Sequence, residues 1–191
     1  VFSFPIFALT FSLAGPVTVA LYGQEYRDSA IYLALLSFGY YFNVALGFNG
    51  LTLKVFGRLR YIVTLNVLAA VANVGLNLLL IPPYGALGAA IGTTATLILH
   101  NVLKQIGLAL STGISLFDWA VLRVYVVIGA ATLVLVLVST LVDLSLPAQV
   151  AFAGFATLAV LLLNRDTLRV GDTFPALLKL RLGRRIFGTD R

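Results

Sequence analysis

Residues 66–104 read NVLAAVANVGLNLLLIPPYGALGAAIGTTATLILHNVLK. The stretch holds two long apolar runs separated only by the segment Pro82-Pro83-Tyr84-Gly85. Each run is long enough for a helix, and two helices joined by so short a turn lie antiparallel against each other. The third predicted helix of the chain therefore ends at Pro82-Pro83, and the fourth begins near Ala86.

The composition is that of a membrane protein. Of the 191 residues, 60% are hydrophobic and only 10% are charged, and the mean hydropathy is +1.03. Soluble domains average about 45–50% apolar and about 25% charged residues. The chain has no cysteine, which excludes disulfides, thiolate metal sites and cysteine nucleophiles. We assign the net charge of +6 to cytoplasmic loops rather than to nucleic-acid binding.

Six segments meet or approach the roughly 20 apolar residues that a helix needs to cross a bilayer. We predict spans at residues 1–22, 30–53, 61–81, 86–110, 120–142 and 148–163. A kink is expected at Gly15-Pro16, and Ser29 or Asp28 is expected to cap the second span. The predicted fold is an all-α membrane protein: a bundle of six transmembrane helices over residues 1–164, followed by a basic cytoplasmic tail over residues 165–191.

The distribution of basic residues predicts the orientation in the membrane. If the six spans alternate, all of the 13 Lys and Arg residues except Arg27 fall on one side. Loops rich in Lys and Arg remain in the cytoplasm. We therefore predict a multi-pass protein of the cytoplasmic (plasma) membrane with both ends of this chain in the cytoplasm and Tyr84 on the far side.

The sequence gives little support for an enzyme. It has one histidine and seven scattered carboxylates, and it contains no GxSxG elbow, HExxH pair or P-loop. We predict no catalytic residue, no metal site and no cofactor.

Polar residues at membrane depth are the better functional lead, because each is costly unless it is paired or faces water. Polar and small residues recur at helical spacing on three predicted spans. On the second span they are Asn43, Gly47, Gly50 and Lys54, and on the third they are Asn66, Asn73 and Asn77. On the fourth they are Thr93, Thr96, His100 and Lys104, and this polar face is widened by Thr94, Asn101 and Gln105. Arg123 enters the fifth span near its predicted cytoplasmic end. The predicted lining of a cationic, polar cavity is Asn73, Asn77, Thr93, Thr96, His100, Asn101, Lys104 and Arg123.

Each of these residues also has a plainer interpretation. The asparagines are equally suited to hydrogen bonds between helices, typically worth about 0.6 kcal/mol. Lys104 and Arg123 are placed where side chains extend to headgroups. His100 is either a cavity residue or a neutral histidine bonded to a neighbouring helix. Gly88 and Gly92 are interpreted as packing residues.

The hairpin motif NVGLNLLLIPPYGALGAAIGT, residues 73–93, resembles the hallmark of polysaccharide flippases. These proteins belong to the multidrug/oligosaccharidyl-lipid/polysaccharide exporter superfamily. The link Tyr22-Gly23-Gln24-Glu25-Tyr26, the pair Asn49-Gly50 and the Gly57-Arg58 loop are also similar to the family at corresponding places. The resemblance covers residues 5–107 well and the remainder by hydropathy alone.

The resemblance implies a transporter of two helix bundles, of which this chain is the C-terminal bundle. The implied activity, in polysaccharide biosynthesis, is to flip a polyprenyl-linked oligosaccharide by alternating access. The implied partners are that substrate, the N-terminal six-helix bundle of the same parent chain, and membrane lipid, with no nucleic acid. The absence of methionine fits a piece of a longer polypeptide.

Two alternatives remain open. One is a cation-coupled multidrug exporter of the same superfamily, against which no acidic residue is found in mid-membrane. The other is a membrane scaffold half that does not itself transport.

Overall fold

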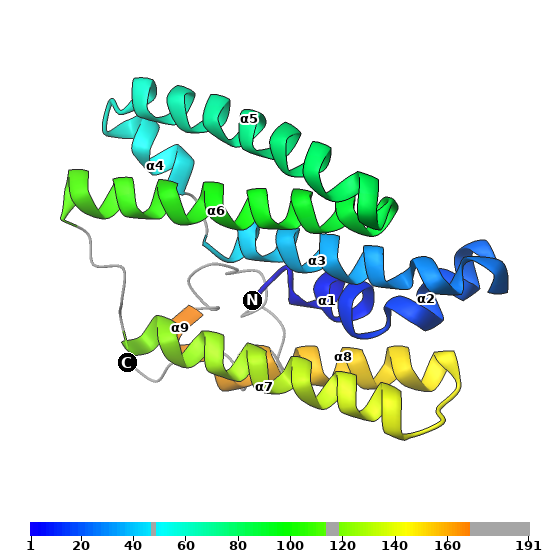
Figure 1. Cartoon of the computed structure of the whole chain (residues 1–191). Coiled ribbons are helices and arrows are strands. Elements are labelled where there is room, and N and C mark those ends of the chain that lie inside the picture. Colours follow the sequence, from blue (N-terminus) through cyan, green and yellow to red (C-terminus); the bar gives the residue numbers. More distant parts are fainter. Residues whose placement is uncertain (47–48, 114–118, 169–191) are drawn as a thin grey trace. The chain divides into compact units, whose positions relative to one another are not determined.

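The computed structural model of the chain describes residues 1–46, 49–113 and 119–168, and these residues form helices and connecting turns without a strand (Figure 1). The elements, in chain order, are α1 (Phe4–Phe7), the π-helical turn η1 (Ala8–Ser12), α2 (Ala14–Tyr22), the 3₁₀ segment η2 (Gln24–Ser29), α3 (Ala30–Ala45), α4 (Asn49–Val55), α5 (Leu59–Tyr84), α6 (Ala86–Thr112), α7 (Trp119–Leu141), α8 (Leu146–Leu163) and α9 (Arg165–Leu168). They belong to two compact units, residues 6–116 and residues 1–5 with 117–191.

The helices are those of a multi-pass membrane protein. Within the described ranges, five are long and apolar enough to cross a membrane, and a sixth span results if the bent pair Phe4–Ser12 and Ala14–Tyr22 counts as one. A lipid environment favours helices because they satisfy every backbone polar group internally. The exposed apolar residues of α5, such as Leu78 and Leu79 at 72% and 73% exposure, suit contact with lipid. The all-α fold is confirmed for the described residues, and its long apolar helices are compatible with a membrane bundle. The count of six and a single bundle over 1–164 stay predictions.

The first predicted span is bent by 80°, but not where we expected a kink. The break falls at Leu13, between η1 and α2, rather than at Gly15-Pro16. Pro16 lies in the first turn of α2, where a backbone N–H has no acceptor within the helix. Proline is tolerated there because its missing N–H costs no hydrogen bond.

The second predicted span comprises α3, which ends at Ala45, and α4, which begins at Asn49. Residues 47 and 48 lie outside the described ranges, and the run Gln24–Val55 counts as one of the five membrane-length helices. Ser29 stands at the N-cap of α3, as predicted, but its side chain caps nothing. Its hydroxyl instead donates a hydrogen bond to the Tyr26 carbonyl at 2.5 Å.

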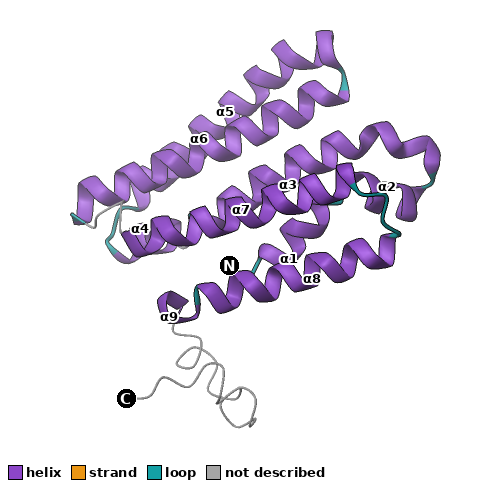
Figure 2. Ribbon diagram, turned by 90° about the horizontal axis from the view of Figure 1, so that it is seen from below, coloured by secondary structure: helices purple, strands orange, loops and turns teal. Residues whose placement is uncertain are grey.

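The hairpin of α5 and α6 is present, and the two helices lie side by side in both views (Figures 1 and 2). The prediction that the helix ends at Pro82-Pro83 is wrong, because α5 continues through both prolines to Tyr84. Proline's fixed φ is helical, so both prolines fit the last turn of α5, although neither can donate to the carbonyl four residues before it, at Leu78 and Leu79. The turn is Gly85 alone, whose φ of +56° is accessible to glycine and whose N–H bonds to the Ile81 carbonyl at 2.7 Å.

Helix α6 is the centre of its unit and packs against α3, α4 and α5. Small residues bring the backbones close: a Cβ on Gly39 of α3 would stand 3.1 Å from the Thr94 Cα of α6. Near the other end of the hairpin, Tyr61 packs over Gly107, and its hydroxyl donates to the Leu103 carbonyl at 2.7 Å. Small residues allow this approach in membrane helices, where no hydrophobic driving force acts between them.

The second unit contains the antiparallel pair α7 and α8, joined by a short turn that includes Asp143. Ser145 is the N-cap of α8, and Pro147 stands in the first turn, where proline is favoured. Both helices match the predicted fifth and sixth spans to within two residues at each end. Of the predicted basic tail, only Arg165–Leu168 is described, as α9, and residues 169–191 lie outside the described ranges.

Candidate functional site: a lysine cleft beside the hairpin

Polar side chains of α5 and α6 fall into two overlapping groups, those that bond to their own or a neighbouring helix and those that line a cleft at the open end of the hairpin. Asn73 and Asn77 are in the first group, since the Asn77 amide donates to the Asn73 amide oxygen at 3.1 Å. The Asn77 Oδ1 is buried without a hydrogen-bond partner in the described chain, and it lies against Gly92 of α6. This part of the predicted stripe therefore lies in the contact between two helices.

Three of the predicted α6 residues bond to backbone carbonyls. The buried hydroxyl of Thr96 donates to Gly92 of its own helix at 2.8 Å, and the amide of Asn101 donates to Leu97 at 2.8 Å. The Thr94 hydroxyl reaches the Leu35 carbonyl of α3 at 2.9 Å, which ties the two helices together. Thr93 is half-buried between these neighbours.

His100 bonds to the neighbouring helix. Its Nε2 lies 2.9 Å from Oδ1 of Asn66 on α5. With the amide in this orientation the ring nitrogen donates and the amide oxygen accepts. This geometry favours the interhelical role for His100, although its bonded partner also lines the cleft described next.

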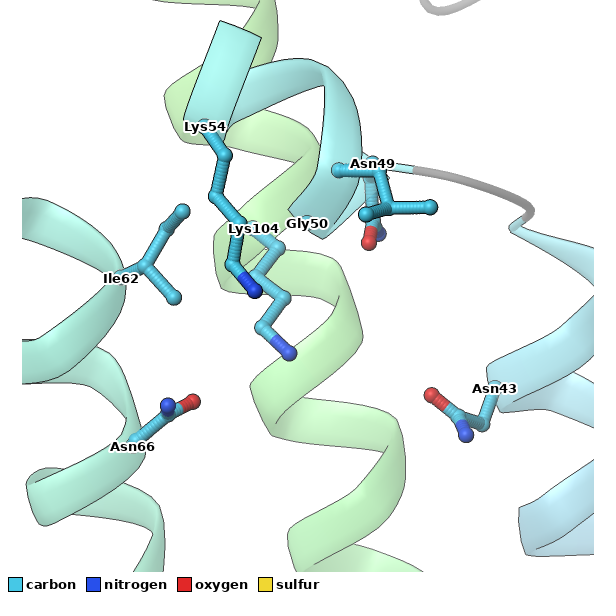
Figure 3. Close-up of a pocket in the computed structure, with 8 residues that line it drawn as sticks. Asn43, Asn49, Gly50, Lys54, Ile62, Asn66 and Lys104 are labelled. Carbon is cyan, nitrogen blue, oxygen red and sulfur yellow. The ribbon is translucent and has the colours of Figure 1, made fainter. Parts of the chain in front are cut away.

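The cleft, which we call the lysine cleft, has a volume of about 320 Å³. Its lining comes from α3, α4, α5 and α6, and comprises Asn43, Asn49, Gly50, Leu51, Lys54, Ile62, Asn66 and Lys104. Figure 3 shows the side chains of Lys54 and Lys104 ending in the same space, with Asn66 on one side and Asn43 on the other. Two ammonium groups and two amides thus converge on one volume.

The position of the cleft follows from the hairpin geometry. Lys104 is 19 residues beyond Gly85, which at the rise of an α-helix is roughly 28 Å from the turn. Asn66 is seven residues from the start of α5. The lysine cleft is therefore at the end of the hairpin opposite Gly85, next to the turn between α4 and α5.

Beneath the cleft, the helices are held by an apolar cluster and one amide. Leu53, Ile62 and Leu108 are buried together, with Tyr61 packed against them. Asn49, only 5% exposed, donates through its amide to the Asn101 carbonyl of α6 at 3.4 Å. These contacts fix α4 against α5 and α6, and so position Lys54 opposite Lys104.

The charge of the cleft is not balanced by its own helices. No carboxylate is found among its lining residues in the described structure. The sequence contains no Asp or Glu at all between Asp28 and Asp118, a stretch that includes Lys54, Arg58, Arg60 and Lys104. A cluster of ammonium groups and amide donors can therefore bind an anion.

Arg123, unlike the other predicted cavity residues, belongs to the second unit. It is exposed on α7, and its guanidinium donates to the Leu163 carbonyl at the end of α8 at 3.4 Å. A shared cavity of Arg123 and Lys104 stays a prediction.

The sequence interpretation left Lys54, Asn43, Asn49 and Asn66 outside the candidate site. A signal for two of them existed, since Asn43, Gly50 and Lys54 recur on one side of the second predicted span. Asn66 also heads the asparagine stripe of α5. The sequence does not give the register of α4 against α5 and α6, and this register decides which of these residues lie together.

The described residues contain no group of three His, Cys, Asp or Glu side chains that would hold a metal ion. When the chain is compared with protein families, curated proteins and solved structures, nothing matches it.

Proposed function

We propose that this chain is part of an integral-membrane flippase or exporter in polysaccharide biosynthesis. It moves a polyprenyl-linked oligosaccharide, or a related polysaccharide precursor, across the cytoplasmic membrane. The observation that carries the proposal is the α5–α6 hairpin with the lysine cleft at its open end. The hairpin is built from the motif that resembles the flippases, and the cleft is cationic and rich in amides.

The chemistry of the cleft suits such a substrate. A polyprenyl-linked oligosaccharide carries phosphate between its lipid and its sugars. Ammonium groups bind phosphate oxygens as point charges, and amides form hydrogen bonds with hydroxyl-rich groups. Lys54 and Lys104 supply the first, and Asn43 and Asn66 the second.

Transport by alternating access needs a second bundle against which this one moves. In the proposal, the partner is an N-terminal six-helix bundle of the same parent chain, as the resemblance implies. The orientation proposed from the basic residues puts the lysine cleft toward the cytoplasm and the Gly85 turn on the far side. The substrate would then first meet the cleft where lipid-linked precursors are made.

The experiment uses the intact parent gene in a strain that depends on it for a surface glycan. Lys104→Ala and Lys54→Ala are expected to reduce surface glycan strongly, because each removes one of the two charges of the cleft. His100→Ala and Arg123→Ala test the remaining predicted cationic residues. Lys104→Arg keeps the charge and is expected to retain most of the glycan. Thr64→Ala is the matched control, since this exposed hydroxyl donates only to the Arg60 carbonyl of its own helix.

The four alanine variants are those at Lys54, Lys104, His100 and Arg123. If surface glycan is unchanged in all four at equal protein levels, these residues do not line the substrate cavity. Drug resistance conferred by the parent gene without any effect on glycans would instead indicate a multidrug exporter. The segment between Asp28 and Asp118 contains no Asp or Glu that could serve as an ion-coupling site.

A further inference from the structure

The surface around the lysine cleft combines exposed cations with exposed apolar side chains. Lys54, Arg58 and Arg60 are exposed at the end of α4 and the start of α5. Beside them stand large apolar side chains with half or more of their surface exposed: Leu51 at 56%, Val55 at 85%, Phe56 at 52% and Leu59 at 57%. A surface with this combination suits an amphiphile, whose head is anionic and whose tail is apolar.

Any anion that pairs with the two lysines of the cleft comes from outside helices α3 to α6. Like charges repel, and a charge at a membrane helix is costly unless it is paired or solvated. The described lining contains no carboxylate, and none occurs in sequence between Asp28 and Asp118. Since helices α3 to α6 all lie within that stretch, no residue of these helices can neutralise Lys54 or Lys104.

The donors in the cleft match a phosphate group. Lys54 and Lys104 end in one space, flanked by the amides of Asn66 and Asn43 (Figure 3). The phosphodiester of a phospholipid shares one negative charge between two non-bridging oxygens, and these oxygens can accept hydrogen bonds from ammonium groups and amides on different sides. The volume of about 320 Å³ is at the lower end of the range for ligand pockets, roughly 300–1,000 Å³.

We infer that the lysine cleft binds the headgroup phosphate of an anionic membrane phospholipid. The phosphate lies between Lys54 and Lys104, and the acyl chains lie against the exposed apolar side chains Leu51, Val55 and Phe56. This occupant is a constituent of the bilayer whether or not the chain is a flippase, and it competes for the same two lysines with the substrate phosphate of the proposed function. Basic pockets between membrane helices bind anionic headgroups by the same chemistry.

Lipid binding is measured on the purified full chain in nanodiscs of phosphatidylcholine. Phosphatidylglycerol, phosphatidylcholine and inorganic phosphate are titrated separately, and bound lipid is counted by native mass spectrometry. The native chain is expected to retain phosphatidylglycerol in preference to phosphatidylcholine. Removing one lysine is expected to weaken binding about fivefold, and removing both about thirtyfold.

Two matched pairs of variants separate a built site from general surface charge. Lys104→Gln and Arg60→Gln remove the same charge, but only Lys104 lines the cleft, so only the first should weaken binding fully. Gly50→Leu changes no charge; a Cβ there would have only the Lys104 Nζ nearby, at 3.9 Å, so the larger side chain enters the cleft. Gly75→Leu is its control, because nothing lies within 4 Å of a Cβ at that position of α5.

The Lys54→Arg/Lys104→Arg variant keeps both charges and is expected to bind as the native chain does. It distinguishes loss of the site from loss of the fold, which circular dichroism in phosphatidylcholine monitors for every variant. Equal weakening by Lys104→Gln and Arg60→Gln would overturn the site in favour of general surface charge. Displacement by inorganic phosphate alone would overturn a lipid occupant. Displacement of phosphatidylglycerol by a polyprenyl pyrophosphate at far lower concentration would assign the cleft to the transported substrate instead.

Discussion

The carbonyl oxygen of Leu80 on α5 lies directly against Gly88 on α6, so that a Cβ at position 88 would stand 2.1 Å from it. The Leu80 carbonyl carbon and the Ile81 nitrogen would be 2.4 Å and 2.9 Å away. These are backbone atoms, which cannot move aside as a side chain can. The two helices of the hairpin therefore leave the Gly85 turn in backbone contact, and only glycine allows it.

Gly88→Ala is therefore expected to destabilise the hairpin by about 3 kcal/mol or more, above the usual 1–3 kcal/mol of an overpacked core. Gly75→Ala on α5 is the matched control, because a Cβ there meets nothing within 4 Å. It should be neutral or stabilising by up to about 1 kcal/mol, as alanine is the better helix former. Thermal unfolding in detergent measures both. Equal stability of the two variants would contradict the close approach.

The contact between Gly92 and Asn77 predicts a coupled pair. A Cβ on Gly92 would stand 2.7 Å from the Asn77 Oδ1, which is the end of a side chain and can give way. Gly92→Ala should therefore cost less than Gly88→Ala, and Asn77→Ala should relieve part of that cost. We expect a coupling free energy of about 0.5–3 kcal/mol in the double-mutant cycle. Additive effects of the two substitutions would show that Asn77 does not limit the space at Gly92.

The hairpin shows which features of the fold can be predicted from the sequence. Two apolar runs around a short turn predicted antiparallel helices, and the small residues Gly88 and Gly92 predicted a close packing face, because both signals are local. The end of α5 was placed before Pro82, since proline usually ends a helix. In the structure both prolines lie inside the last turn, and Gly85 with its positive φ ends the helix.

The candidate site depends on contacts between helices, which local sequence patterns do not predict. The α6 stripe of Thr96, His100 and Lys104 was predicted to face one cavity, yet Thr96 bonds back to its own helix and His100 to Asn66. Lys104 instead meets Lys54, which is distant in sequence. Helical spacing gives the residues that share a face of one helix. Which faces meet depends on the packing of α4 against α5 and α6, which no spacing within one helix encodes.

The hydrogen bond between His100 and Asn66 predicts a modest stabilising interaction between α5 and α6. Alanine substitutions at both positions, singly and together, should give a coupling of about 0.6 kcal/mol and at most about 1.7 kcal/mol, as measured for similar bonds in membrane proteins. Thermal unfolding in detergent measures the cycle. The pair Tyr61 and Leu103 is a useful reference: Tyr61→Phe removes another bond across the same helices and should cost about 0.5–1.5 kcal/mol. A coupling of zero would contradict the bond and indicate that His100 and Asn66 act separately.

The orientation of the hairpin can be tested directly, because these 191 residues contain no cysteine and a single-cysteine variant of this chain carries one thiol. Tyr84→Cys places a thiol at the turn, where the native side chain is 57% exposed, and Arg58→Cys places one at the α4–α5 turn. If basic loops remain in the cytoplasm, an impermeant maleimide added to intact cells should label position 84 and not position 58. Permeabilised cells should show labelling of both. Labelling of position 58 alone in intact cells would reverse the orientation, and with it the proposal that the lysine cleft faces the cytoplasmic leaflet.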